Sequence, residues 1–130
     1  MKIRLEDGLP YVSVILVQGS HQIKLEKVLI DTGSVSSVFM ADKALEIGLQ
    51  LERDDIIHRI RGVGGAEFVF SKAVDRLALG ELEVGKFEIE VGAMEYGFEI
   101  EGIIGLDFLM AVGAMIDLDR MEIYHSVASS

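Results

Sequence analysis

The sequence contains no cysteine, a single proline and no apolar run of about 20 residues. Without cysteine, disulfide bonds, thiol catalysis and thiolate metal sites are excluded. The histidines His21, His58 and His125 are scattered and lack metal-ligand spacing, so we expect no metal ion and no cofactor. Residues 11–17 are apolar, but no small-residue cleavage site follows them. We therefore expect neither a signal peptide nor a membrane span, and we expect a cytoplasmic protein.

Basic residues are also scarce, at 12 against 22 acidic residues, which gives a formal net charge of −10. A surface this negative repels nucleic-acid backbones and anionic membranes, so we expect neither as a partner. Half of the residues are apolar, which argues against disorder. A chain of 130 residues is long enough for one domain with a modest core, and we expect a single domain over residues 1–130.

Short β-rich segments separated by turn residues dominate the chain and predict an all-β fold with one or two short helices. One helix is expected at residues 41–48, ending at Gly48, and a helical turn at residues 108–112, with Asp107 as its N-cap. The expected strands are residues 11–18, 21–30, 56–60, 66–74, 76–79, 86–93, 114–118 and 121–125.

The motif Asp31-Thr32-Gly33-Ser34 directly follows the solid apolar run Val28-Leu29-Ile30. A carboxylate at the end of a buried strand is held in a fixed position by rigid backbone, as a catalytic group requires. Gly33 permits a tight turn, and the hydroxyls of Thr32 and Ser34 can form hydrogen bonds to a neighbouring loop. The alternative is an ordinary aspartate turn at a strand end, and the motif alone does not exclude it.

A second motif is the glycine-rich tip of the hairpin expected around residues 61–65, which contains Gly62, Val63, Gly64 and Gly65. Such a tip can bring backbone amides close to an extended peptide. A dinucleotide-binding loop is excluded, because the required glycine spacing fails and no alternation of strands and helices follows. A purely structural hairpin remains an alternative.

Taken in order, residues 28–34, 60–65 and 103–109 (VLIDTGS, IRGVGG and IIGLDFL) resemble the retropepsin-type aspartic proteases. The resemblance extends over about residues 10–125, and the ordered set is far more specific than any one motif. It implies a closed, β-barrel-like acid protease fold in a single lobe that dimerises, each subunit supplying one aspartate.

The resemblance also implies roles for individual residues. Asp31 is expected to be catalytic, with Thr32 bracing the paired loops, Gly33 lining the substrate cleft and Ser34 supporting the active-site loop. The substrate-binding flap is expected to contain Gly62, Val63, Gly64 and Gly65, with the amides of Val63 and Gly64 at its tip. Residues 103–109 are expected to support Asp31 from behind.

Two departures from the viral members of that family stand out. Viral enzymes typically pair an aspartate just after the motif with an arginine after the later glycine, whereas this chain has Val35 and Leu106 at those positions. An apolar contact between these two side chains is expected in place of the ion pair. Arg61 stands where viral flaps usually have glycine.

With only one such motif in the chain, the second carboxylate of an aspartic protease must come from another copy. Asp107 and Asp117 are poor substitutes, because one is expected to cap a helix and the other lies in a terminal strand. We therefore predict a homodimeric aspartic endopeptidase that cleaves peptide or protein substrates. The alternative is a catalytically inactive module of the same fold that dimerises or binds peptides, and an unrelated β-barrel would require three accidental motif matches.

Overall fold

Apolar and β-branched runs form most of the strands, as their alternation of inward and outward side chains requires. The computed structural model describes residues 1–62 and 65–126. Its strands are β1 (Arg4–Glu6), β2 (Leu9–Gln18), β3 (His21–Ile30), β4 (Val38–Met40), β5 (Ile57–Gly62), β6 (Gly65–Leu79), β7 (Leu82–Gly92), β8 (Gly102–Ile104), β9 (Ala114–Asp117) and β10 (Glu122–His125), and its helices are α1 (Ala41–Leu45) and α2 (Leu106–Ala111).

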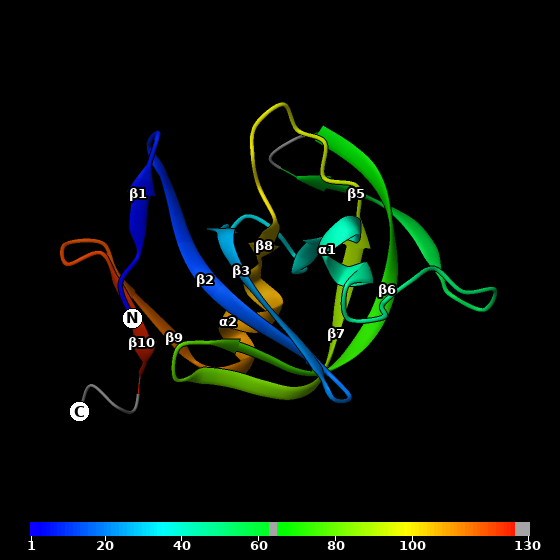
Figure 1. Cartoon of the computed structure of the whole chain (residues 1–130). Coiled ribbons are helices and arrows are strands. Elements are labelled where there is room, and N and C mark those ends of the chain that lie inside the picture. Colours follow the sequence, from blue (N-terminus) through cyan, green and yellow to red (C-terminus); the bar gives the residue numbers. More distant parts are fainter. Residues whose placement is uncertain (63–64, 127–130) are drawn as a thin grey trace.

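Eight of these strands form one sheet in the order β1-β2-β3-β8-β4-β7-β6-β5 (Figure 1). An additional pairing between β2 and β6 joins strands that are distant in this order, so the sheet curls back on itself. Strands β3 and β8 run parallel and lie side by side in its middle. The predicted mostly-β fold with two short helices is confirmed.

The inner surface of the curled sheet contains the main apolar core. Phe39, Phe108 and Ile104 are fully buried there, together with much of β2, β3 and β7. A second, smaller apolar cluster forms between strands of the sheet and the segment that joins β7 to β8, and its buried members are Tyr11, Leu29, Val38, Val69, Met94, Ile100 and Ile103. Burial of each large aliphatic side chain contributes roughly 1.5–3 kcal/mol, so strand β3, which adds to both clusters, is firmly anchored.

The hairpin of β9 and β10 forms a separate two-stranded sheet beside the main one (Figure 1). The first residues of the chain run along β10: the Ile3 amide donates to the Met121 carbonyl at 2.8 Å, and the Ile123 amide to the Met1 carbonyl at 2.9 Å. The N-terminus is thereby bound to the C-terminal hairpin of the same chain.

Four local predictions need correction. The strand expected at 86–93 begins at Leu82 and runs through Gly85 to Gly92, because β6 pairs with its whole length. The segments 66–74 and 76–79 form the single strand β6, because β7 pairs with both parts in one continuous register. Helix α1 ends at Leu45, three residues earlier than expected. Asp107 does not cap α2, since the N-cap is Gly105 and Asp107 lies in the first turn.

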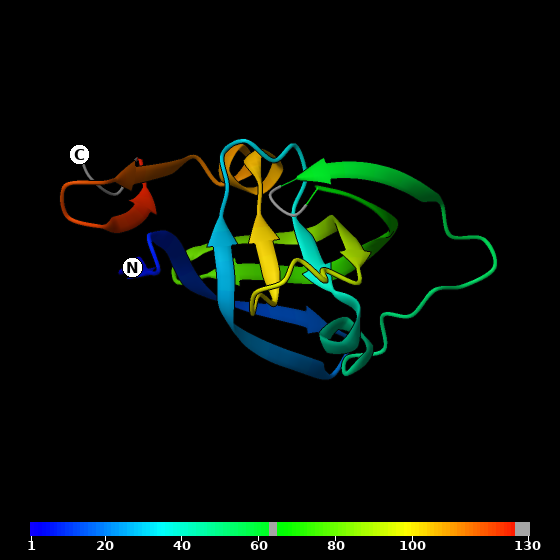
Figure 2. The same cartoon turned by 90° about the horizontal axis from the view of Figure 1, so that it is seen from above.

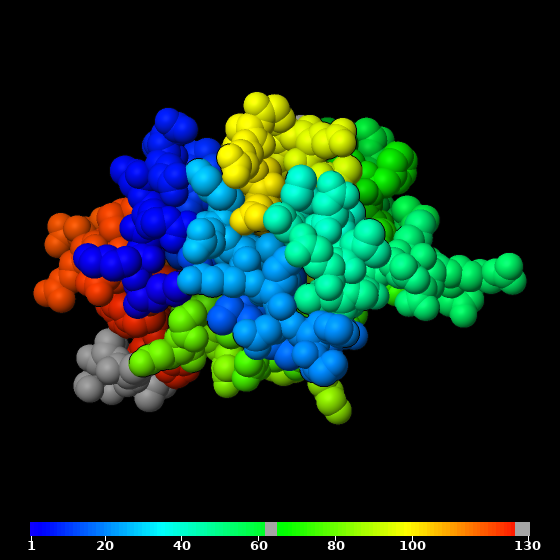
Figure 3. Space-filling model, in the orientation of Figure 1, coloured from blue at the N-terminus to red at the C-terminus, as the bar shows by residue number. Residues whose placement is uncertain are grey.

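A projecting segment, residues 50–56, extends from the body between α1 and β5 (Figure 3). The Glu52 amide donates to Asp55 Oδ2 at 2.7 Å, and the Asp55 amide returns a bond to the Glu52 carbonyl at 3.0 Å. Lys72 on β6 contacts both carboxylates, at 2.5 and 2.8 Å. These contacts raise the pKa of Lys72 against the lowering effect of burial, and they lower the pKa of Asp55.

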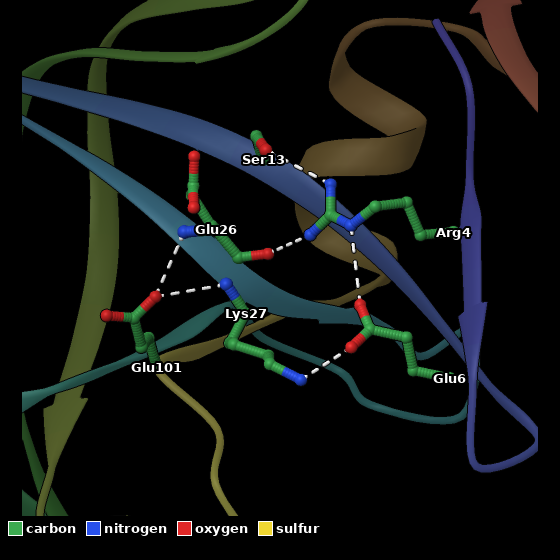
Figure 4. Close-up of polar contacts among 6 residues, drawn as sticks. All are labelled: Arg4, Glu6, Ser13, Glu26, Lys27 and Glu101. Atoms are coloured by element: carbon green, nitrogen blue, oxygen red, sulfur yellow. Dashed lines mark hydrogen bonds and ion pairs between the residues drawn. The ribbon is translucent and has the colours of Figure 1, made fainter.

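A polar network joins β1 to β3 and to the segment before β8 (Figure 4). Arg4 donates to Ser13 Oγ at 3.2 Å and to the Glu26 carbonyl, while Lys27 Nζ lies 2.6 Å from Glu6 Oε1. Glu101 accepts the backbone amides of Glu26 and Lys27 at 2.9 and 3.0 Å. The network therefore holds four chain segments together: β1, β2, β3 and the segment before β8.

A surface groove of about 650 Å³ lies over this network. None of its lining residues belongs to the Asp31 loop, and each of its three basic side chains pairs with an acidic one that also lines it: Arg4 and Lys27 with Glu6, and Lys24 with Glu26. The groove is thus explained by structural ion pairs, and we assign it no ligand.

The Glu6–Lys27 contact gives a prediction about acid stability. The hydrogen bond from Lys27 holds the pKa of Glu6 below its ordinary value of 4.5. A lowered pKa in the folded state contributes stability that is present above about pH 4.5 and is lost as the pH falls below it. We expect thermal melts of Glu6→Gln to show a smaller loss of stability on acidification than the wild type. Glu81→Gln, a change on an exposed turn, is the control, and equal acid dependence in all three proteins would contradict the prediction.

Candidate active site

Asp31 is placed by two parallel strands that end side by side. Ile30 at the end of β3 pairs with Ile104 at the end of β8, and the Asp31 amide donates to the Ile104 carbonyl at 2.9 Å. Both isoleucines are buried, whereas Asp31 is partly exposed. The carboxylate therefore leaves the core at a point fixed by strand pairing, as the sequence predicted.

The turn after β3 orients the Asp31 side chain. The Gly33 amide donates to Asp31 Oδ1 at 2.9 Å, and the Ser34 amide donates to the Asp31 carbonyl at 3.1 Å. A Cβ atom on Gly33 would lie 3.2 Å from Asp31 Oδ1, so glycine allows the amide to approach closely. The bond from the Gly33 amide fixes the rotamer of the Asp31 carboxylate.

Gly105 lies directly beneath the Asp31 loop, defined as residues 31–37. A Cβ atom there would lie 2.5 Å from the Ser36 carbonyl oxygen and 2.8 Å from that of Ser34. The Leu106 amide donates to the Ser34 carbonyl at 2.8 Å, and the Asp107 amide to the Val35 carbonyl at 3.3 Å. The start of α2 thus supports the loop through backbone contacts that only glycine permits at position 105.

Hydrogen bonds between Ser37 and Asp107 hold the C-terminal end of the Asp31 loop in place. Ser37 is fully buried, and its hydroxyl donates to Asp107 Oδ1 at 2.8 Å and accepts the Gly105 amide at 3.0 Å. Its own amide donates to Asp107 Oδ2 at 3.0 Å. Asp107 is therefore a structural carboxylate and no substitute for a catalytic one.

This arrangement predicts the cost of removing the carboxylate. Asp107→Ala leaves the Ser37 amide and hydroxyl without their acceptors, and a buried unsatisfied group costs about 1–3 kcal/mol. We expect urea denaturation to show a loss of that size. Asp107→Asn, which keeps one acceptor oxygen, is expected to lose less. Equal stability of the alanine variant and the wild type would contradict this account.

A recess of about 220 Å³ separates the Asp31 loop from the β5–β6 hairpin. Gly33, Ser34, Val35 and Ser36 line one side, and Ile60 and Arg61 line the other. In Figure 2 the far end of β5 reaches back over the loop that follows β3. A peptide in this recess would lie between the active-site loop and the hairpin.

A residue near the tip of the hairpin attaches it to the segment that follows β7. Glu67 on β6 accepts the Met94 amide at 3.1 Å and the Tyr96 hydroxyl. Burial and then the Glu67 carboxylate raise the pKa of Tyr96 well above its ordinary value, so it stays a proton donor. Nearby, Ile60 and Val69 pack on the second apolar cluster.

The glycines expected in the flap are described in part. Gly62 and Gly65 pair across the hairpin as the end of β5 and the start of β6, and Gly65 has a φ of +102°, which favours glycine. Val63 and Gly64, expected at the flap tip, lie outside the described residues.

The chain is similar to known proteins in sequence and in fold. The model of a family described as "Aspartyl protease" matches residues 16–108, which include Asp31, the hairpin and the start of α2. The chain belongs to the aspartyl protease family. No curated protein matches it. Its fold is similar to that of a retropepsin-like aspartic protease from Rickettsia conorii, with a TM-score of 0.65, 19% identity and 93% of each chain covered. The retropepsin-like resemblance is thereby confirmed.

Several apolar side chains on the Asp31 loop, on α2 and after β9 are exposed. Val35 is 83% exposed and Leu106 is 38% exposed, so neither is buried by the contact expected between them. Met110 on α2 and Leu118 after β9 are also exposed. Thr32 is exposed next to the buried Ile30.

Two other kinds of feature, a metal site and a membrane-spanning helix, are absent from the described part of the chain. Over residues 1–62 and 65–126, His, Asp and Glu side chains form no cluster of three that could bind a metal ion. Over the same ranges, no helix has the length and apolarity needed to cross a membrane.

Sequence reasoning missed the role of Ser37 and misplaced that of Asp107. These residues are 70 positions apart, and no local pattern links them. The order of the motifs was the available signal, because it predicted that residues 103–109 would contact the Asp31 loop from behind.

Proposed function

We propose that this family member is an aspartic endopeptidase that acts as a homodimer, with the Asp31 carboxyls of two copies forming one catalytic pair. The observation that carries the proposal is the position of Asp31, which is fixed at a strand end and oriented by Gly33 beside a recess closed by the hairpin. Gly33 and Ser34 line that recess, so a peptide bound there would reach the loop that holds the carboxylate.

The chemistry requires two carboxyls that share one proton. Close carboxyls cannot both ionise at low cost, so one stays protonated near the pH at which the other is charged. The charged group takes a proton from water, which attacks the peptide carbonyl, while the protonated group gives its proton to the carbonyl oxygen, so that a tetrahedral intermediate forms. Collapse of this intermediate breaks the C–N bond: the first carboxyl gives the proton taken from water to the leaving nitrogen, and the second takes its proton back from a hydroxyl of the intermediate. The apparent pKa values then belong to the pair.

An apolar recess next to Asp31 supports pairing with a second copy. Its volume is about 310 Å³, and its lining residues are apolar except Thr32: Ile3, Pro10, Ile30, Thr32, Ile116 and Leu118. Leu118 is 72% exposed at its rim. Thr32 directly follows the catalytic aspartate, so a partner covering this recess would lie beside Asp31.

Strand β9 offers a second point of contact. Its one partner in the described part of the chain is β10, so the other edge of β9 can pair with a strand of another molecule. A two-fold axis between the copies would place the same edges and the same recesses together. The alternative, an inactive module that dimerises or binds peptide, would use the same surfaces without needing the Asp31 carboxylate.

Hydrolysis of an unfolded protein, measured from acidic to neutral pH, tests the proposal. We expect cleavage at internal peptide bonds. We also expect inhibition by a peptide whose scissile bond is replaced by a hydroxyl-bearing tetrahedral carbon, because it mimics the transition state. Peptide binding without cleavage at any pH would favour the inactive module and contradict the proposal.

A further inference from the structure

The recess between the Asp31 loop and the hairpin is lined by one charged side chain, that of Arg61. Its other lining residues are Gly33, Ser34, Val35, Ser36 and Ile60. Resting on the function proposed above, we propose that Arg61 determines specificity by binding a carboxylate side chain of the substrate. The substrate class is then a peptide with an aspartate or glutamate at a position near the scissile bond.

Over residues 1–62 and 65–126, no carboxylate lies within 4.0 Å of the Arg61 guanidinium, and what sets Arg61 apart from other unpaired cations is its place in the recess. Half of the 12 cations contact a carboxylate within 4.0 Å: Arg4, Lys24, Lys27, Lys43, Lys72 and Arg76. Arg61 has no such partner among the residues that the structure describes. Acidic residues outnumber basic ones by 22 to 12, yet none of those described pairs with Arg61. Its guanidinium is therefore available to bind a carboxylate side chain of another molecule.

The nearest acid along the hairpin is already engaged. Arg61 pairs in register with Ala66, and the neighbouring Glu67 lies opposite Ile60. Both carboxylate oxygens of Glu67 accept bonds, from the Met94 amide and the Tyr96 hydroxyl. In this register Glu67 and Ile60 lie on the face of the hairpin opposite to Arg61, so Glu67 does not compete for the guanidinium.

The guanidinium suits this role chemically. The planar donors of a guanidinium bind a carboxylate through two parallel hydrogen bonds. The net charge of −10 makes the rest of the surface unfavourable for an acidic peptide. An acidic side chain of the substrate would thus be recognised at the part of the recess that Arg61 lines.

Matched peptides test the inference. Glutamate and glutamine are compared at each position around the scissile bond, and kcat/KM is measured for each pair. A hydrogen bond to a charged group predicts that the wild type prefers glutamate at one position by about tenfold. Arg61→Gln should abolish this preference, and Arg61→Glu should prefer lysine there. Arg59→Gln, which removes the same charge from the same strand outside the recess, should keep it.

Peptide binding to Asp31→Asn separates this inference from the proposed function. If no peptide is cleaved, the proposed function fails, yet a tenfold binding preference for glutamate that is lost on adding Arg61→Gln would still support the role of Arg61. Equal binding and cleavage of every matched pair by the wild type would overturn it. Three other results would also overturn the role of Arg61. They are a preference for glutamate that persists in Arg61→Gln, loss of the dimer in Arg61→Gln, and a pH profile of hydrolysis that Arg61→Gln shifts for both peptides of a pair.

Discussion

Asp31→Asn is expected to lower kcat/KM for peptide hydrolysis by about 10³-fold or more, within the range that positioned acid–base groups contribute. An amide cannot take a proton from water or share one with the partner carboxyl. The substitution should leave the fold intact, because the Asn carbonyl oxygen can still accept the Gly33 amide that Asp31 Oδ1 accepts. Loss of activity with unchanged stability therefore identifies a chemical role.

Asp75→Asn is the matched control for that experiment. It makes the same carboxylate-to-amide change on β6, away from the proposed dimer contacts, where Asp75 Oδ2 accepts the Gly19 amide at 2.6 Å. Circular dichroism and thermal melts of both variants should match the wild type. Retained hydrolysis by Asp31→Asn would exclude Asp31 as the catalytic carboxylate, and loss of activity in Asp75→Asn would show that the effect is not specific.

Gly105→Ala is expected to destabilise the chain by about 3 kcal/mol, at the upper end of the cost of overpacking. The added methyl group would lie under 3 Å from the carbonyl oxygens of Ser34 and Ser36. Both atoms are backbone, so the Asp31 loop and the start of α2 must move apart. The Leu106 bond to the Ser34 carbonyl would then lengthen. We expect peptidase activity to fall with stability, because this contact supports Asp31.

Gly85→Ala provides the control for the glycine substitution. A Cβ atom at Gly85 would meet the Asp75 carbonyl oxygen at 3.6 Å, an ordinary van der Waals contact. Alanine in a strand interior is favoured over glycine by roughly 0.5–1 kcal/mol, so this variant should be as stable as the wild type or slightly more stable. Equal urea midpoints for Gly105→Ala and Gly85→Ala would contradict the close-contact argument.

The position of Asp31 could be predicted because its determinants are local. The apolar run Val28-Leu29-Ile30 indicates a buried strand, and the motif that follows marks its end. The strand pair β2 and β3 was predictable for the same reason, and it is described close to the expected bounds. The two short helices were expected, but their ends were not, because helix ends depend on contacts such as that of Gly105 with the Asp31 loop.

Strand β1 was not predicted, although the sequence carries a signal for it. Asp7 and Gly8 both have positive φ values, 52° and 78°, and they join Glu6 to Leu9 in a two-residue hairpin turn. Asp-Gly between β segments is typical of this turn. The polar residues Arg4 and Glu6 obscured the strand, since their side chains form the charged network of Figure 4 instead of an apolar face.

Contacts between distant segments could not be deduced from composition or periodicity. The bonds between Ser37 and Asp107 link the Asp31 loop to α2, and the bonds of Glu67 link the hairpin to the segment before β8. Such pairs become visible only once the sheet order is known. The unpaired state of Arg61 is likewise a property of the folded chain.

The central claim is that two copies each contribute Asp31 to one site, and mixing the wild type with Asp31→Asn tests it most directly. If hydrolysis needs two carboxyls, mixed dimers are inactive, and an equal mixture that has exchanged subunits keeps about a quarter of the activity of the same total amount of wild type. If each chain acts alone, the same mixture keeps about half. Sedimentation must first show that the dimers dissociate and re-form, so that subunits exchange. If activity then falls in direct proportion to the fraction of Asp31→Asn over the whole range of mixtures, the shared site is contradicted.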